Sequence, residues 1–136
     1  MKLKIFAAFA GAVVAISAFT GCVSTVTDSN SFGVPFVQDD VEGKYNRTVQ
    51  QVYAAAVTVV KRNGTINTEY IPHYTTNTVV ALSGRVNQQN VWVRVTAIDP
   101  NKPITQIIVQ ARTKGGLADV DLAHELEKEV ALELAR

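Results

Sequence analysis

The sequence reads VWVRVTAI over residues 91–98, DPNKP over residues 99–103 and ITQIIVQAR over residues 104–112. Apolar and polar residues alternate in both flanking stretches, which is typical of β-strands with one face on a hydrophobic core. The Pro- and Asn-containing stretch between them favours a turn. We therefore expect an antiparallel β-hairpin over residues 91–112.

The apolar positions also predict how the two strands align. If Ile98 pairs with Ile104 across the turn, every apolar residue lies opposite another apolar residue. The pairs are Val95 with Ile107, Val93 with Val109 and Val91 with Ala111. A slip of one residue would turn the apolar set of one strand to the wrong face. The register of this hairpin is therefore the best determined part of the predicted fold.

Two amphipathic helices are expected around the strands. The first runs from Asn46, a candidate N-cap, to Gly64, a residue that suits a helix end, and the second follows Asp119, another candidate cap. Their apolar residues recur at three- and four-residue steps: Val49, Val52, Tyr53, Ala56, Val57 and Val60 in the first, and Leu122, Ala123, Leu126, Val130 and Leu134 in the second. Both patterns indicate helices with one face on the core.

Two further strands are expected over residues 65–71 and 76–83. The run of apolar residues at 79–82 lacks alternation and fits two registers. The predicted fold class is α+β, with an antiparallel four-stranded sheet, two helices packed on one face and the order α-β-β-β-β-α.

The first 22 residues, MKLKIFAAFAGAVVAISAFTGC, have the layout of a secretory signal. Lys2 and Lys4 form a cationic start, residues 5–19 are uncharged, and small residues follow. An uncleaved transmembrane helix is the alternative, but it needs roughly 20 apolar residues and this run is shorter. We expect cleavage after residue 21.

The end of the leader, Phe19-Thr20-Gly21-Cys22, resembles the bacterial lipobox, in which Phe19 replaces the usual Leu. The resemblance implies that the thiol of Cys22 receives diacylglycerol and that Cys22 becomes the mature amino terminus. A lone cysteine in an exported chain needs such an explanation, because it cannot form an internal disulfide. Because Val23 and not Asp follows Cys22, the resemblance also implies the periplasmic face of the outer membrane.

Residues 22–43 are rich in Ser, Thr, Asp and Gly, and they predict a flexible tether. The expected organisation is a signal peptide at 1–21, a lipidated N-terminus and tether at 22–43, and an α+β domain at 44–136. The chain has 13 Lys and Arg and 12 Asp and Glu. Lys2 and Lys4 lie in the leader, so the mature chain has 11 cations against 12 anions and no basic excess for nucleic acid or anionic lipid.

Residues 45–136 look like a group of small bacterial lipoproteins classed together as a domain of unknown function. The shared features are the lipobox, the Val- and Ala-rich first helix containing Tyr53, the alternating strands at 91–95 and 107–109, and the turn at 115–119 before the last helix. The resemblance implies an α+β fold and an envelope location, and it implies no catalytic residues.

No stretch of the sequence predicts catalytic, cofactor-binding or metal-binding residues. His73 and His124 do not have the spacing of a helical metal site, and no serine lies in a Gly-x-Ser-x-Gly motif. Gly115 and Gly116 lack the other residues of a phosphate-binding loop. We therefore expect that the protein is not an enzyme and has no cofactor.

The second face of the predicted sheet carries a possible partner surface, formed by Trp92, Arg94, Ile108 and Arg112. An exposed Trp flanked by Arg is typical of protein interfaces. The alternative is that the linker containing Phe36 folds back over this face. The leading functional hypothesis is a non-catalytic, lipid-anchored envelope protein that binds another envelope component. The alternatives are a hydrolase acting on peptidoglycan or lipid, and an inert structural spacer.

Overall fold

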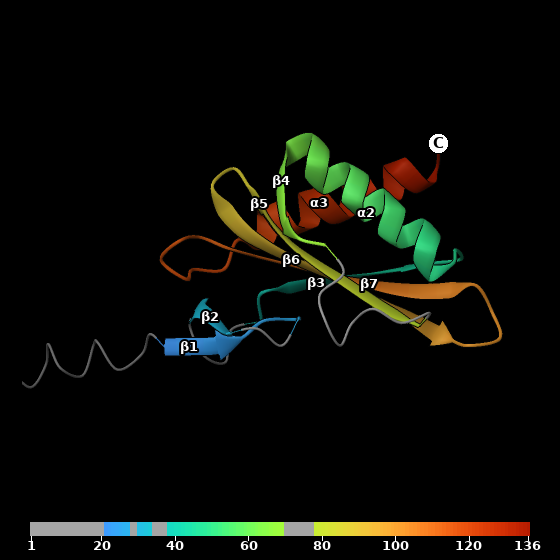
Figure 1. The fold of residues 1–136 in the computed structure, drawn as a ribbon, viewed down its shortest axis with the longest axis horizontal. Coiled ribbons are helices and arrows are strands. Elements are labelled where there is room, and N and C mark those ends of the chain that lie inside the picture. Colours follow the sequence, from blue (N-terminus) through green and yellow to red (C-terminus); the bar gives the residue numbers. More distant parts are fainter. Residues whose placement is uncertain (1–20, 28–29, 34–37, 70–77) are drawn as a thin grey trace, which may run out of the picture.

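The computed structural model describes residues 21–27, 30–33, 38–69 and 78–136. These residues form a five-stranded antiparallel sheet in the order β3-β7-β6-β5-β4, a separate two-stranded antiparallel ribbon, β1-β2, and two helices. Figure 1 shows both helices on one side of the five-stranded sheet and the β1-β2 ribbon on the other side.

The elements in chain order are β1 (Gly21–Ser24), β2 (Asn30–Gly33), β3 (Asp40–Tyr45), α2 (Val49–Asn63), β4 (Gly64–Thr68), β5 (Val79–Val86), β6 (Gln89–Asp99), β7 (Ile104–Arg112) and α3 (Val120–Leu134). The predicted strand over residues 65–71 therefore begins one residue earlier and ends at Thr68. Residues 70–77 lie outside the described part of the chain, so the start predicted for the next strand at residue 76 is outside it as well.

The predicted register of the central hairpin is confirmed. Strands β6 and β7 pair with Val95 opposite Ile107, Val93 opposite Val109 and Val91 opposite Ala111. Near the turn the register shifts, so that Asp99 and not Ile98 lies opposite Ile104. The shift leaves Ile98 without a partner in the ladder and 48% exposed, as expected for a β-bulge next to a turn.

Both helices begin with a side-chain cap. Thr48, and not the predicted Asn46, caps α2: its Oγ1 accepts from the Gln51 amide at 3.2 Å, while the Gln51 Oε1 accepts from the Thr48 amide at 3.0 Å. This reciprocal capping box satisfies two amides at the helix start. Asp119 caps α3 as predicted, because its Oδ1 accepts from the Leu122 amide at 2.9 Å.

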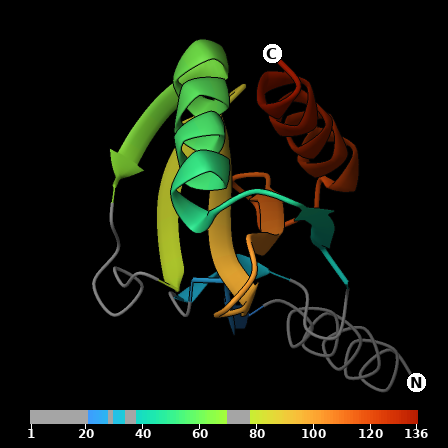
Figure 2. The same ribbon diagram turned by 90° about the vertical axis from the view of Figure 1, so that its right-hand side faces the viewer.

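The hydrophobic core lies between the sheet and the two helices, which run side by side over the same sheet face (Figure 2). The residues that fill it are almost all aliphatic. The helices contribute Val49, Val52, Tyr53, Ala56, Val59, Val60, Leu122, Ala123, Leu126 and Val130, and the strands contribute Val80, Leu82, Val86, Val91, Val93, Val95, Ile107, Val109 and Ala111. The prediction that both helices pack on one face of the sheet is therefore confirmed.

The prediction of a four-stranded sheet is wrong, because the sheet has five strands. The additional strand, β3, pairs along β7, with Val41 opposite Val109 and Gly43 opposite Ile107. Its residues 40–43 fall within the predicted tether, so the domain boundary expected at residue 44 lies inside this strand. An unpaired edge on β7 would leave a row of backbone amides and carbonyls unsatisfied, and β3 supplies their partners.

Strand β3 is also attached to helix α3 through side chains. The Tyr45 hydroxyl donates a hydrogen bond to the Glu127 carboxylate, and this carboxylate lies against Gly43, where a Cβ would collide with it. Burial, together with the bond to Glu127, raises the pKa of the Tyr45 hydroxyl above its usual value. The phenol therefore stays protonated at neutral pH and can donate to Glu127.

No helix within the described ranges is both long enough and apolar enough to cross a membrane. Residues 1–20, which contain the predicted signal sequence, lie outside those ranges.

Gly64, between α2 and β4, provides a test of the packing at the sheet edge. Its φ of −173° is ordinary extended backbone, so it is not the left-handed helix end that the sequence suggested. A Cβ at this position would instead collide with the backbone oxygen of Arg85 on β5. We expect Gly64→Ala to lower the free energy of unfolding by about 2 kcal/mol, because overpacking forces the strands apart.

Gly115→Ala is the matched control, since the nearest atom to its added Cβ is the Thr113 hydroxyl oxygen at 3.9 Å. Denaturant titration of both variants measures the difference. Equal stability of the two variants would contradict the assigned contact between β4 and β5.

Candidate functional site

Cys22 lies in strand β1, where it pairs with Phe32 of β2. Its thiol is free and exposed. The backbone is extended on both sides of it, from Gly21 to Ser24. The sole cysteine of the chain is therefore accessible to a modifying enzyme, and it belongs to the ribbon that lies on the opposite side of the sheet from the helices (Figure 1).

The four residues of the predicted partner surface share one face of the central hairpin. Arg94 lies opposite Ile108, and Trp92 lies opposite Gln110 in the next pair of the same face. Arg112 is two residues beyond Gln110 on β7 and so points to the same side. The structure thus assembles Trp92, Arg94, Ile108 and Arg112 as expected, on the face that the helices leave uncovered.

This face is covered, which contradicts the expectation of an exposed Trp anchor. Trp92 is only 8% exposed, Ile108 7% and Arg112 4%, while Arg94 is intermediate. The described residues between 21 and 39, which we call the N-terminal strap, lie against part of this face, because Ser24, Val26 and Asp39 are hydrogen-bonded to Gln110 or Arg112. This outcome corresponds to the alternative in which the linker folds back, although Phe36 itself lies outside the described residues. Binding of a partner by these four residues stays an untested prediction.

Asp39 attaches the strap to the sheet. One carboxylate oxygen accepts from Gln110 Nε2 at 2.6 Å, and the other accepts from Arg112 Nε. Gln110 uses its second polar atom as well, because its Oε1 accepts from the amide of Val26 at 3.0 Å. Asp39, Gln110 and Arg112 are all buried, so this cluster joins both ends of the strap to β7 away from water.

Arg112 is the centre of this cluster. Besides its ion pair with Asp39, its Nη2 donates to the Ser24 carbonyl at 3.5 Å, and its guanidinium lies 5.8 Å from the centre of the Trp92 ring. A buried guanidinium requires such partners, because its desolvation costs several kcal/mol. Even so, the Nη1 atom of Arg112 and the Nε atom of Arg94 are buried without a hydrogen-bond partner in the structure described.

Sequence reasoning missed Asp39, although a signal for it is present. Gln110 and Arg112 alternate with Val109 and Ala111, at the end of a strand whose opposite face is apolar from Ile107 onward. Long polar side chains that become buried nearly always find a charged or polar partner. The two adjacent carboxylates of Asp39 and Asp40, at the start of β3, are the natural source of one.

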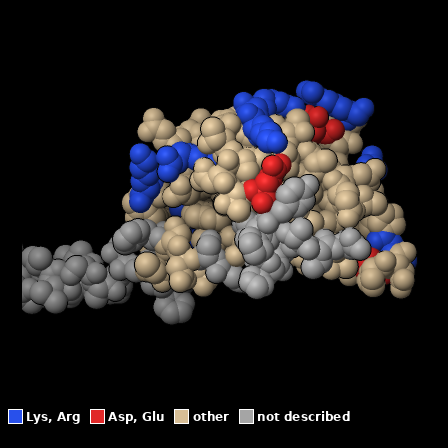
Figure 3. Space-filling view, viewed as in Figure 1, with Lys and Arg blue, Asp and Glu red and all other residues tan. Residues whose placement is uncertain are grey.

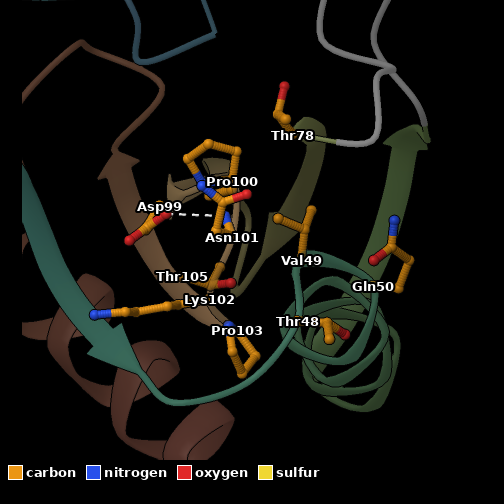
Figure 4. A pocket seen from close by; sticks show the side chains of 11 residues that line it. Thr48, Val49, Gln50, Thr78, Asp99, Pro100, Asn101, Lys102, Pro103 and Thr105 are labelled. Carbon is orange, nitrogen blue, oxygen red and sulfur yellow. Dashed lines mark hydrogen bonds between the residues drawn. The ribbon is translucent and has the colours of Figure 1, made fainter.

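A depression of about 350 Å³ lies at the other end of the hairpin, between the β6–β7 turn and the first turn of α2 (Figure 4). It is lined by Thr48, Val49, Gln50, Thr78, Ala97, Asp99, Pro100, Asn101, Lys102, Pro103 and Thr105. Asp99 and Lys102 are its ionisable groups. Asp99 Oδ1 accepts from the Asn101 amide at 2.8 Å, and the Lys102 side chain extends away from α2. The lining contains neither a thiol nor an imidazole, and its carboxylate is engaged in the turn.

Of the two histidines, His124 alone lies in the described part of the chain. His124 is exposed on α3, and His73 lies outside the described ranges. Within those ranges, three or more His, Cys, Asp or Glu side chains do not come together in a way that could hold a metal ion. The expectations that the protein has no cofactor and is not an enzyme stay predictions.

Comparison with protein-family models found no match, and comparison with curated proteins found none either. The resemblance to the small lipoproteins of a domain of unknown function therefore remains an expectation from the sequence.

Asp39→Ala tests whether the strap is held by the buried ion pair. Removing one partner of such a pair costs about 3–5 kcal/mol when the other charge stays buried. Here the strap can release and let water reach Arg112, so we expect a smaller loss of stability together with a red shift of the fluorescence of Trp92, the sole tryptophan. Emission spectra and acrylamide quenching measure the exposure of its indole.

The matched control is Glu42→Gln on β3, whose carboxylate is exposed and accepts from Gln106 Nε2 at 2.9 Å. We expect an unchanged emission spectrum for this variant. An unshifted spectrum in Asp39→Ala would show that the strap does not depend on the pair.

Proposed function

We propose that this protein is a lipid-anchored bacterial envelope lipoprotein whose α+β domain is a non-catalytic binding or structural module. The observation that carries the proposal is the leader ending in Phe19-Thr20-Gly21-Cys22. The free and exposed thiol of Cys22 supports it, because lipidation requires an accessible sulfur. We place the protein at the periplasmic face of the outer membrane, on the resemblance of the residues after Cys22 to a sorting signal.

The anchor is chemically sufficient to hold the protein on a membrane. Each buried CH₂ group of an acyl chain contributes about 0.8 kcal/mol, and a single chain binds only reversibly. A diacylglycerol thioether on Cys22 supplies two chains, and an amide-linked chain on its amino group would supply a third. No basic surface is needed for attachment, which agrees with the nearly balanced charge of the chain.

The non-catalytic part of the proposal is drawn from the groups present in the described residues. The alternative of a hydrolase acting on peptidoglycan or lipid needs a nucleophile, a base or a metal in one cleft. The ionisable groups of the depression at the β6–β7 turn are Lys102 and Asp99, and the Asp99 carboxylate already accepts a hydrogen bond from the Asn101 amide. No observation therefore favours that alternative.

The position of the lipid can be tested with two cysteine variants. In the wild-type protein we expect mass spectrometry to find an amino-terminal Cys22 with an acylglycerol thioether, and thiol titration to find no free sulfhydryl. Cys22→Ala should abolish the lipid and leave the leader uncleaved. Its effect on the fold should be small, because the side chain is exposed.

The control is the double variant Cys22→Ala and Ser24→Cys, which moves the thiol two residues away from the lipobox. We expect it to remain unmodified, since the small residues that precede Cys22 are then in the wrong register for the signal peptidase. A wild-type protein that keeps its leader and a titratable thiol would falsify the proposal.

A further inference from the structure

We propose that the N-terminal strap holds the domain directly against the bilayer, with the β1-β2 side of the domain facing the lipid. This inference rests on the proposed lipidation of Cys22, and it adds an interaction surface and an orientation to that proposal. It replaces the flexible tether expected from the composition of residues 22–43.

The first argument is the short distance between the lipid and the docked chain. The Ser24 carbonyl accepts from Arg112, and the Val26 amide donates to Gln110, so the chain is attached to β7 two residues after Cys22. Strand residues advance about 3.3 Å each, so Cys22 and Ser24 are about 7 Å apart along the chain. A lipid on Cys22 therefore leaves almost no free chain between the membrane and the domain.

The second argument is the distribution of charge. The described residues of the ribbon, 21–27 and 30–33, contain no charged side chain, and the sequence has one acidic residue, Asp28, between them. Charged groups are costly to bring toward a bilayer, since they lose hydration there. In the view of Figure 3, the Lys and Arg side chains lie mainly along the helix side of the molecule and at its ends. With a single charged residue between positions 21 and 33, the ribbon is thus the side that approaches lipid at low cost.

The third argument is that the strap is hydrogen-bonded to the sheet near both of its ends. Asp39, near its carboxyl end, and Val26, near its amino end, are joined through Gln110. If this cluster opened, residues 23–39 would become a tether with a reach of about 55 Å. The buried contacts of Asp39 therefore decide whether the domain rests on the membrane or moves freely above it.

The intrinsic fluorescence of Trp92 can measure the orientation of the domain on the bilayer. It is buried on the strap-facing side of the sheet, and the Arg112 guanidinium that bonds to Ser24 lies 5.8 Å from the centre of its ring. The lipidated full chain is reconstituted in phosphatidylcholine vesicles containing a headgroup-nitroxide lipid, which quenches nearby indoles. With Ser24 only about 7 Å from the lipidated residue, we expect at least about a twofold loss of Trp92 fluorescence.

The matched reporter places the indole on the helix side, in the double variant Trp92→Phe and Leu132→Trp. Leu132 is on α3 and 57% exposed, so the reporter should keep most of its fluorescence. Asp39→Ala should reduce the quenching of Trp92 toward that of the reporter, while Glu42→Gln should leave it unchanged. If Asp39→Ala does not fold, the comparison of Trp92 with the reporter still measures the orientation.

Each other outcome contradicts a particular part of the proposal. Equal quenching of the two positions would mean a freely rotating domain, and stronger quenching of the reporter would mean the opposite orientation. Either result overturns the inference while the lipid anchor stands. A wild-type protein that does not float with the vesicles would instead overturn the anchor itself, and the orientation with it.

Discussion

Strand β7 is buried on both of its faces, and the rest of the structure follows from this constraint. Ile107 and Val109 point to the helices, and Ile108 and Gln110 point to the opposite side, yet all four are nearly inaccessible to solvent. A strand in this position needs a cover on each face and a partner along each edge. The two helices form the first cover, the N-terminal strap forms the second, and β3 and β6 occupy the edges.

The two covers differ in their chemistry. The helix side is a packed aliphatic core, in which stability comes from apolar area removed from water. The strap side buries an ion pair, a glutamine and a tryptophan, and its order depends on the pairing of polar groups. Such a contact is sensitive to the loss of a single partner, because an unpaired buried charge is strongly unfavourable. The strap side is therefore the part of the molecule in which a local change can have a large effect.

The strap also changes what the proposed lipid anchor would do. A composition rich in Ser, Thr, Asp and Gly is typical of a chain that lifts a domain away from the bilayer. In the structure, this same stretch supplies two strands of the ribbon, the carboxylate of Asp39 and the start of β3. Ser24, Val26 and Asp39 are therefore bonded to the sheet. The low hydrophobicity of this stretch does not prevent docking, since it binds mainly through backbone groups and through Asp39.

The sequence by itself determined the elements whose evidence is local. The register of the β6–β7 hairpin follows from alternation, the two helices follow from three- and four-residue spacing, and Asp119 is recognisable as a cap. The shared face of Trp92 and Arg112 follows from the same alternation. Each of these depends on a period that neighbouring residues display in the chain.

Tertiary structure alone decided the fifth strand and the covered face. Val41 and Tyr45 are the only large apolar residues of β3, which is too weak a pattern to separate a strand from a linker, and the strand forms because the edge of β7 needs a partner. Asp39 and Arg112 are 73 residues apart, so no local period connects them. Pairing across such a separation is selected by the energy of the assembled structure, in which a buried guanidinium must find a carboxylate.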